Sequence, residues 1–239
     1  MTSFVLVHGS WHGGWCWRKL TPLLRQAGHE THPLTLTGLG DRVHLLRQDV
    51  GLDTHIQDVV QYLEYEDLHD VILVGHSYAG MIIGAVGVQA APRVAQLVYL
   101  DSINPRDGES FFTHDPGTEE PTIERARQEN GVTVVPPHDP TEFGVTDPDD
   151  VRWMRERLRP HPLLAYQQPT HMPEGNTSHI TCSYIWCTAS GFLKHEADLA
   201  RRDGWQMYEI NASHEVMITA PNELAQVLLE IEKKNERLR

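Results

Sequence analysis

One hexapeptide, Gly-His-Ser-Tyr-Ala-Gly at residues 75–80, constrains this chain more than any other feature. Residues 71–74 before it form a short continuous apolar run, which is typical of a buried parallel strand. Residues 81–86 after it are apolar or small and predict a helix. A serine between small residues at a strand-to-helix turn is typical of a nucleophile elbow, in which a strained turn lifts the hydroxyl above the sheet edge. Ser77 is therefore a candidate nucleophile, and the flanking strand and helix argue against a chance Gly-x-Ser turn.

Strands and helices are expected to alternate at both ends of the sequence. Strands are predicted at residues 4–7, 29–36, 71–74, 94–100, 181–186 and 206–210, and those at 4–7 and 71–74 are continuous apolar runs. Helices are expected before Gly28, from a cap at Asp53 or Thr54 through Leu63, after the serine, and from Pro221 onward. This alternation predicts an α/β fold with a mostly parallel sheet that helices cover on both faces.

The middle of the chain breaks the alternation. Of the 15 prolines, 11 lie between Pro105 and Pro173, and central strands exclude proline, so no sheet is expected there. Helices are expected over residues 119–130 and from Asp147 onward. Because open α/β sheets bind ligands at the carboxyl ends of their strands, such an insertion would roof the site. We predict a single domain with a core of residues 1–103 and 180–239 and a cap of residues 104–179; a surface excursion without a part in the site is the alternative.

Composition and charge restrict the partners of the chain. Its 20 Lys and Arg against 33 Asp and Glu give a net charge of −13 at pH 7, which disfavours nucleic acid and anionic membranes. No apolar run approaches the roughly 18 residues that a membrane span needs, and the first residues lack the pattern of a signal peptide. Cys16, Cys182 and Cys187 leave one cysteine unpaired in any scheme, which favours a reducing cytoplasm. A homodimer stays open.

The candidate nucleophile needs a base, because a serine hydroxyl is weak until its proton can leave. Position decides among the 15 histidines. His214 stands in a polar loop after the last predicted strand and before the last helix, where enzymes with such an elbow carry their histidine. His214 is therefore the candidate base, and a solvated loop histidine is the alternative.

Two backbone N–H groups are expected to form an oxyanion hole. One belongs to Tyr78, directly after the candidate nucleophile, and the other to Ser10 in the loop after the first strand. His8 in that turn is expected to be a structural hydrogen-bonding group rather than a second base. Trp11 beside it is a candidate for lining an apolar acyl or aryl pocket.

Five stretches carry a resemblance to a known family. They are residues 4–9, 13–15, 71–80, 97–101 and 184–214. Together they resemble the α/β-hydrolase branch that contains plant methyl-salicylate esterases, hydroxynitrile lyases and related bacterial carboxylesterases. The resemblance spans nearly the whole chain and is vaguest in the cap. It implies a cofactor-free serine–histidine–acid hydrolase that acts on a small ester beneath a helical cap.

Three positions depart from that family's pattern. Ala79 stands where the family has glycine, and its small size is expected to serve. Glu215 follows the candidate histidine where the lyases carry lysine, which weakens a lyase function. The family's usual acid position falls near Ser190, where no carboxylate occurs. Asp101, which ends the strand after the nucleophile strand, is then the candidate acid, with Glu215 as a second candidate and a turn or capping aspartate as the alternative.

These observations predict a serine carboxylesterase that works through an acyl-enzyme. No metal or cofactor is expected. His8 and His12 flank a glycine loop rather than lying on a helix, which does not suit a metal site. A different glycine loop, at residues 38–40, lacks the lysine and serine of a phosphate-binding loop. Cap aromatics, among them Trp153 and Tyr166, favour an apolar or aryl small-molecule ester. A lactone-opening hydrolase or a lyase on the same site, or a non-catalytic small-molecule receptor of the same fold, are the alternatives.

Overall fold

The computed structural model describes residues 1–172 and 180–238, and its core is a parallel sheet of six strands. In spatial order these are β2 (Glu30–Pro33), β1 (Ser3–Val7), β3 (Val71–Ser77), β4 (Val94–Ser102), β8 (Thr181–Cys187) and β9 (Gln206–Ile210). All six predicted strands form, and β2 is shorter than expected because it ends at Pro33 on the sheet edge. The chain crosses from β2 over β1 to β3, so the topological switch point lies between β1 and β3, where such sheets bind ligands.

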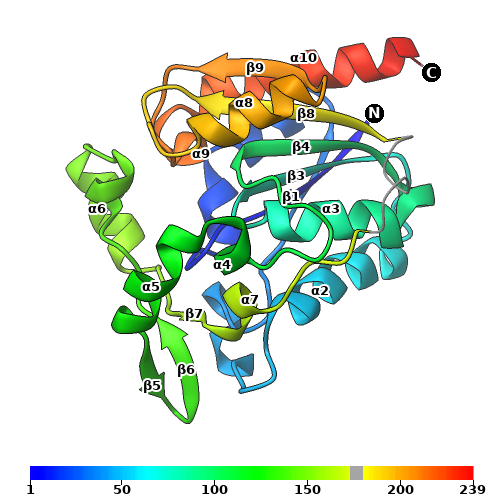
Figure 1. Cartoon of the computed structure of the whole chain (residues 1–239). Helices are drawn as coiled ribbons and strands as arrows, with labels where there is room; N and C mark the ends of the chain where they lie inside the picture. The colour runs from blue at the N-terminus through cyan, green and yellow to red at the C-terminus, as the bar shows by residue number, and fades with distance from the viewer. Residues whose placement is uncertain (173–179, 239) are drawn as a thin grey trace.

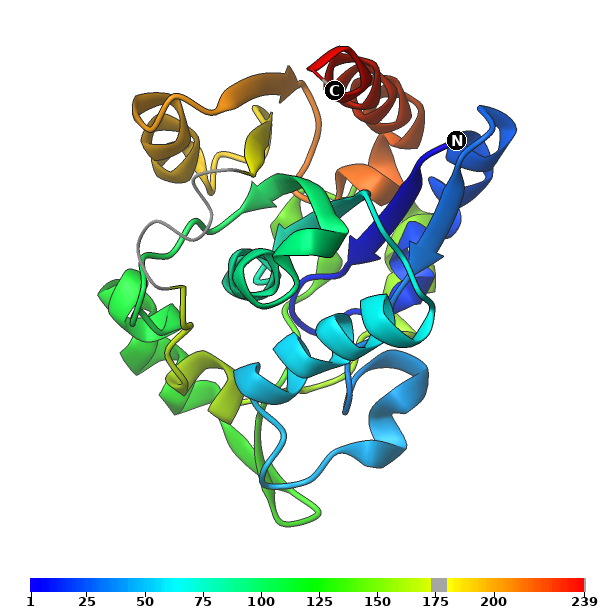
Figure 2. The same ribbon diagram turned by 90° about the vertical axis from the view of Figure 1, so that its right-hand side faces the viewer.

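Helices cover both faces of this sheet (Figures 1 and 2). On one face lie α2 (Leu52–Tyr65), α3 (Gly80–Gln89) and α8 (Lys194–Arg202), and on the other lie α1 (Thr21–Gln26), α9 (Val216–Thr219) and α10 (Pro221–Leu238). Each face packs into its own buried apolar cluster, and α3 is buried all round because it is apolar on every side. The helices thus cover the two faces of the sheet but not the edge formed by the carboxyl ends of its strands.

The start of α2 differs from the prediction. Gly51 is the N-cap, and neither Asp53 nor Thr54 takes that place. Leu52 is fully buried, so the first turn begins with an apolar residue packed into the core. Thr54 Oγ1 then accepts the Gly51 N–H at 3.5 Å from inside the first turn.

The segment between β4 and β8 lies beyond the carboxyl ends of the core strands (Figure 1), and we call its described part, residues 104–172, the cap segment. Its helices are α4 (Phe111–His114), α5 (Glu119–Arg125), α6 (Pro148–Arg155) and α7 (Leu164–Gln167), with α6 capped by Asp147. The predicted end of the cap at residue 179 falls outside the described residues.

The expectation that the cap segment has no sheet is wrong. It contains a small antiparallel sheet of β5 (Arg127–Glu129), β6 (Val132–Val135) and β7 (His161–Pro162). The predicted helix over 119–130 stops at Arg125, because Asn130 and Gly131 take φ of 51° and 82° and join β5 to β6 in a tight hairpin. Asn-Gly favours such two-residue turns, and Pro162 is tolerated because β7 lies at the edge.

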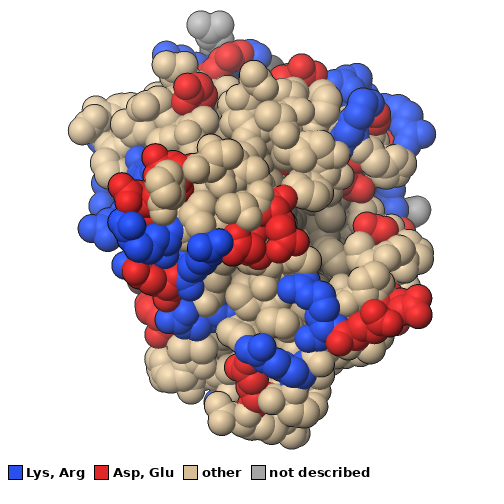
Figure 3. All heavy atoms as spheres, turned by 90° about the vertical axis from the view of Figure 1, so that its left-hand side faces the viewer, with Lys and Arg blue, Asp and Glu red and all other residues tan. Residues whose placement is uncertain are grey.

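The charged side chains on one face of the molecule are mixed in sign. On the face that carries the cap segment, acidic and basic side chains are interspersed, so the net negative charge does not gather in one patch there (Figure 3). No helix in residues 1–172 or 180–238 has the length and apolar character needed to cross a bilayer. The three cysteines are all free thiols.

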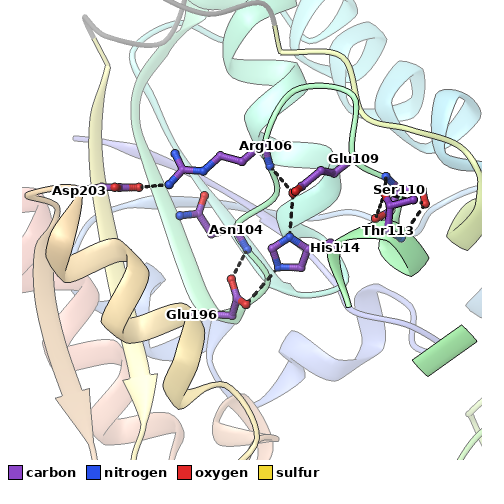
Figure 4. A network of polar contacts seen from close by, with 8 residues as sticks. All are labelled: Asn104, Arg106, Glu109, Ser110, Thr113, His114, Glu196 and Asp203. Carbon is purple, nitrogen blue, oxygen red and sulfur yellow. Dashed lines mark hydrogen bonds and ion pairs between the residues drawn. The ribbon is translucent and has the colours of Figure 1, made fainter. Parts of the chain in front are cut away.

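A partly buried histidine joins the cap segment to the core (Figure 4). His114, at the end of α4, lies 2.9 Å from Glu109 Oε2 through Nδ1 and 3.1 Å from Glu196 Oε1 on α8 through Nε2. Glu196 Oε2 also accepts the N–H of Asn104, two residues after the end of β4, at 3.0 Å. Burial opposes a charged imidazole, but the two carboxylates outweigh it and raise the pKa of His114 from 6.5 to about 9.

His114, Glu109 and Glu196 form an ionic clamp, and this clamp predicts that the anchoring of the cap segment depends on pH. Because the folded-state pKa of His114 is raised, its stabilisation is complete below about pH 6.5 and is lost as pH rises through about 9. We expect His114→Gln to lower the free energy of unfolding by about 2 kcal/mol at about pH 6 and by much less at about pH 10. Urea denaturation of both proteins at the two pH values measures this difference, and an equal loss at both would contradict an ionic clamp.

Candidate active site

Ser77 sits on a strained turn between β3 and α3. Its φ is 55°, a left-handed conformation that a residue with a side chain rarely adopts. Gly80 makes the turn possible, since a Cβ there would lie 1.9 Å from the carbonyl oxygen of Ile103. Ala79 is buried at the N-cap of α3, so the small residue that departs from the family pattern fits the turn. The elbow predicted from residues 75–80 is the observed geometry.

Asp101 is aimed by an irregularity in β4. His76 pairs with Leu100 and Ser77 pairs with Ser102, so Asp101 is the extra residue between two successive pairs, with φ of 38°. Such bulges re-aim side chains next to active sites. Asp101 is fully buried, and its Oδ1 accepts the N–H of Cys187 at the end of β8 at 3.1 Å. The neighbouring strand therefore holds the carboxylate in place.

The other oxygen of Asp101 faces the candidate base. His214 Nδ1 lies 2.7 Å from Asp101 Oδ2, so Nδ1–H donates to the carboxylate and the neutral ring keeps its lone pair on Nε2. Burial alone would lower the pKa of His214, but the hydrogen bond to Asp101 and its negative charge outweigh burial and raise this pKa. The two residues come from strands separated by β8 in the sheet, and the loop after β9 brings His214 back across the end of β8.

Ser190 and Glu215 do not serve as alternative partners of His214. Ser190 Oγ donates to the carbonyl oxygen of Cys187 at 2.8 Å and only closes the turn after β8. Glu215 turns away from the His214–Asp101 pair and lies 3.2 Å from His12. Of the two candidate carboxylates, Asp101 is thus the one that contacts His214.

The loop after β1 approaches the elbow closely. A Cβ on Gly9 would lie 2.9 Å from Ser77 Cβ, so only glycine allows this approach. Within residues 1–172 and 180–238, no hydrogen-bond acceptor is found for the N–H of Ser10 or of Tyr78, and Ser10 lines the same cavity as Ser77. Trp11, at φ 66°, anchors the loop to the cap segment: its N–H donates to His161 and its carbonyl accepts from Arg159. The two free N–H groups have the character of oxyanion donors.

A cavity of about 260 Å³ opens at this edge of the sheet. Ser77, His214 and Ser10 all line it. Five aromatic side chains from the loops and the cap segment contribute to its walls, together with Ile103, Val135 and Leu193; the aromatic residues are Trp11, Phe111, Phe143, Tyr166 and Phe192. Polar cap side chains, Asp115, Thr118, Thr122, Arg125 and His138, also line it. Its size and aromatic walls suit a small, largely apolar ligand.

Trp153 and His8 are the remaining residues singled out in the sequence. Trp153 does not line this cavity: it packs edge-on against Trp15 at 5.0 Å between ring centroids, and the guanidinium of Arg157 lies over its ring. Helical spacing put Trp153 in the cap without indicating which face it occupies. His8 has the structural role expected of it, because it accepts the N–H of Leu36 through Nε2 and lies 2.8 Å from the carbonyl oxygen of Gly9 through Nδ1.

A buried polar cluster next to His214 was not predicted from the sequence. His76, directly before the candidate nucleophile, lies 3.0 Å from the carbonyl oxygen of His214 through Nε2, and the two rings are 4.6 Å apart. His12 and Glu215 form a second buried pair. Only the adjacency of His76 to Ser77 and of Glu215 to His214 could have marked them. Among the described residues, no group of three or more histidine, cysteine, aspartate or glutamate side chains is arranged to hold a metal ion.

The contact between Gly9 and the elbow predicts the effect of a single methyl group. Gly9→Ala would place a Cβ 2.9 Å from Ser77 Cβ and 3.0 Å from His76 Nδ1, so both loops must shift. We expect a loss of about 1–3 kcal/mol in the free energy of unfolding, measured in urea. Gly117→Ala is the matched control, since its nearest neighbour would be 3.6 Å away and a change within about 0.5 kcal/mol is expected. Equal stability of the two variants would refute the close approach.

Comparison with known proteins places this geometry in a family. The model of the alpha/beta hydrolase family matches residues 4–227. The carbendazim hydrolyzing esterase of a Nocardioides species is 37% identical over 239 residues, covering 95% of this chain and 98% of the relative. Salicylic acid-binding protein 2 of Nicotiana tabacum is 27% identical and covers 97% of each chain.

Solved structures share the same fold. An extracellular alpha/beta-hydrolase from a Paenibacillus species superposes with a TM-score of 0.84 at 23% identity, covering 96% of this chain and 98% of that one. At this identity the similarity concerns the fold, and it agrees with the six-stranded parallel sheet and the helices on its two faces. The chain belongs to the alpha/beta hydrolase family.

Proposed function

We propose that this chain, a hydrolase of ester bonds, is a serine carboxylesterase that acts on a small apolar or aryl ester through an acyl-enzyme. The observation that carries the proposal is the 2.7 Å contact between His214 Nδ1 and Asp101 Oδ2, beside a cavity that Ser77 also lines. A carboxylate that fixes the tautomer of a histidine next to a strained serine is the arrangement of a catalytic triad. The relative that is named an esterase supports the same activity.

In the proposed mechanism, Ser77 Oγ attacks the ester carbonyl while His214 Nε2 takes the proton of the Ser77 hydroxyl. The N–H groups of Ser10 and Tyr78 stabilise the oxyanion, and each such donor is worth on the order of a hundred- to a thousand-fold in rate. His214 then passes the proton to the departing alcohol. Water attacks the acyl-enzyme in the second half, with His214 again as the base, and Asp101 stabilises the imidazolium in both halves.

The substrate class follows from the walls of the cavity. Trp11, Phe111, Tyr166 and Phe192 offer aromatic surface to an acyl or aryl group, and the cavity volume of about 260 Å³ favours a small ester. Phe112 does not line this cavity and belongs to the apolar core instead. Trp11 is fixed for this role because its Nε1–H donates to the carbonyl oxygen of Val135 at 3.0 Å.

The proposal predicts the activities of three variants toward p-nitrophenyl acetate. Ser77→Ala is expected to abolish turnover, and Asp101→Asn to lower kcat by about 10⁴-fold, because the histidine loses the carboxylate that sets its tautomer. Ser190→Ala is the control, since its hydroxyl only closes a turn, and it is expected to keep wild-type activity. Turnover that survives Ser77→Ala would exclude Ser77 as the nucleophile, and turnover that is indifferent to Asp101→Asn would remove Asp101 from the triad.

The raised pKa of His214 predicts the pH dependence of kcat/KM. The base must be neutral, so activity rises with pH through the pKa of His214, which lies above its ordinary value of 6.5. In Asp101→Asn the hydrogen-bonded charge is gone, and the acid limb of the residual activity is expected to move to lower pH. A pH profile from single-turnover or steady-state rates measures the shift. An unmoved acid limb would show that Asp101 does not act on the titrating group.

A further inference from the structure

A second buried ion pair lies beside the proposed triad and has no part in the mechanism above. His12, in the loop after β1, and Glu215, in the loop after β9, are only 2% and 1% exposed, and His12 Nε2 lies 3.2 Å from Glu215 Oε2. Each ion taken out of water costs several kcal/mol, so a buried pair is an expensive way to fill a core. The pair joins the loop after β1 to the loop after β9, and both loops carry residues of the proposed active site.

Both ring nitrogens of His12 face oxygen atoms. Its Nδ1 lies 2.7 Å from the carbonyl oxygen of Ser10, which can only accept, so Nδ1–H donates to it. Its Nε2 faces Glu215 Oε2 at 3.2 Å, in a close contact that lacks the geometry of a hydrogen bond. The ring is also held by Trp15, on which it stacks at 5.2 Å.

The two ends of the pair lead directly to the reacting groups. Ser10, which bonds His12 through its carbonyl oxygen, carries one proposed oxyanion donor on its N–H. Glu215 is the residue after His214, so its side chain restrains the same turn of backbone that carries the base. His76 restrains this turn from a third side, because its Nε2–H donates to the carbonyl oxygen of His214 at 3.0 Å.

We propose that His12 and Glu215 are positioning residues that tie the oxyanion loop to the catalytic histidine, so that the distance between the two is set by an ion pair. This inference rests on the proposed function, because it assigns a purpose to the pair only if Ser10 and His214 act on one substrate. The pair touches no reacting atom. It acts through the backbone of Ser10 on one side and of His214 on the other, and misplacement of such groups by about 1 Å costs on the order of a hundred-fold in rate.

The electrostatic surroundings keep Glu215 ionised. Burial alone would raise the pKa of Glu215, but the charge and hydrogen bond of His12, with smaller contributions from His76 and His214, lower it to about 2. The ionisable groups that face Glu215 from the packed elements are His12, Cys16, His76, Cys187 and His214. Both thiols have their pKa raised, first by burial and further by nearby carboxylates including Glu215, so they stay neutral.

Two substitutions at Glu215 separate positioning from simple packing. Glu215→Met keeps the volume but leaves His12 without its partner, and we expect kcat toward p-nitrophenyl acetate to fall by about 10- to 100-fold with KM changed by less than about threefold. Glu215→Gln can donate to a neutral His12 Nε2 while His12 Nδ1–H still bonds Ser10, so it is expected to recover most of that loss. Rates are expressed per folded site, after thermal unfolding has measured the folded fraction.

The control removes a buried carboxylate elsewhere. Glu232 on α10 is 4% exposed and accepts the hydroxyl of Thr2 at 2.8 Å, far in the fold from the carboxyl edge of the sheet. Glu232→Met is expected to lose stability but to keep kcat per folded site within about twofold. If Glu215→Met also kept its kcat per folded site, or if Glu215→Gln lost as much as Glu215→Met, the positioning role would be overturned.

A measurement without substrate tests the pair independently of the esterase. In protein labelled with ¹⁵N-histidine, the Nε2 signal of His12, identified by its absence from His12→Gln, is expected to shift in Glu215→Gln, because an amide then replaces the carboxylate beside it. A His12 Nε2 signal that does not respond to Glu215→Gln would overturn the contact between the two side chains. If the protein shows this response but no turnover that depends on Ser77, the proposed function fails and the pair remains as a structural bridge without a catalytic purpose.

Discussion

The hydrogen bond between His214 and Asp101 is the interaction on which the rest of the site depends. It joins a residue beyond the edge strand β9 to one on the central strand β4, over a separation of 113 residues in the chain. The bond forms because a bulge at the end of β4 turns Asp101 toward the loop, and because Cys187 on the intervening strand holds the second carboxylate oxygen. Without that arrangement His214 would be a buried histidine with no reason to take up a proton. With it, the ring has a fixed tautomer and a raised pKa.

Three of the six non-glycine residues with positive φ in the described part of the chain lie where chemistry is proposed. Trp11, Ser77 and Asp101 have positive φ, and each stands just beyond or at the carboxyl end of a different core strand. Each such conformation costs on the order of 1–3 kcal/mol, which the surrounding core must offset. The two apolar clusters on the faces of the sheet are the source of that stability, and the elbow, the bulge and the oxyanion loop rest on strands that they bury completely. The strained residues thus stand at the ends of strands whose side chains are largely buried.

The sequence pattern predicted those features that depend on neighbouring residues. Strand-like segments predicted the six core strands, and the turn at residues 75–80 predicted the position of Ser77. Chain order indicated His214, and the lack of a carboxylate near Ser190 directed attention to Asp101. The Asn130–Gly131 hairpin was missed because prolines nearby suggested that no sheet forms. The position of Trp153 was predicted wrongly, and the His12–Glu215 pair was not predicted. Both depend on contacts between residues that lie far apart in the chain, and the periodicity of a single sequence carries no information on such contacts.

The central claim is that Ser77 becomes acylated during turnover. The most direct measurement is to quench the enzyme during hydrolysis of p-nitrophenyl acetate and to locate the acyl group by peptide mass spectrometry. The account predicts a single acetylated site at Ser77, accumulating within the first turnovers, and its absence from Ser77→Ala. Acetyl on another residue, or rapid ester hydrolysis by folded protein in which Ser77 is never modified, would contradict it.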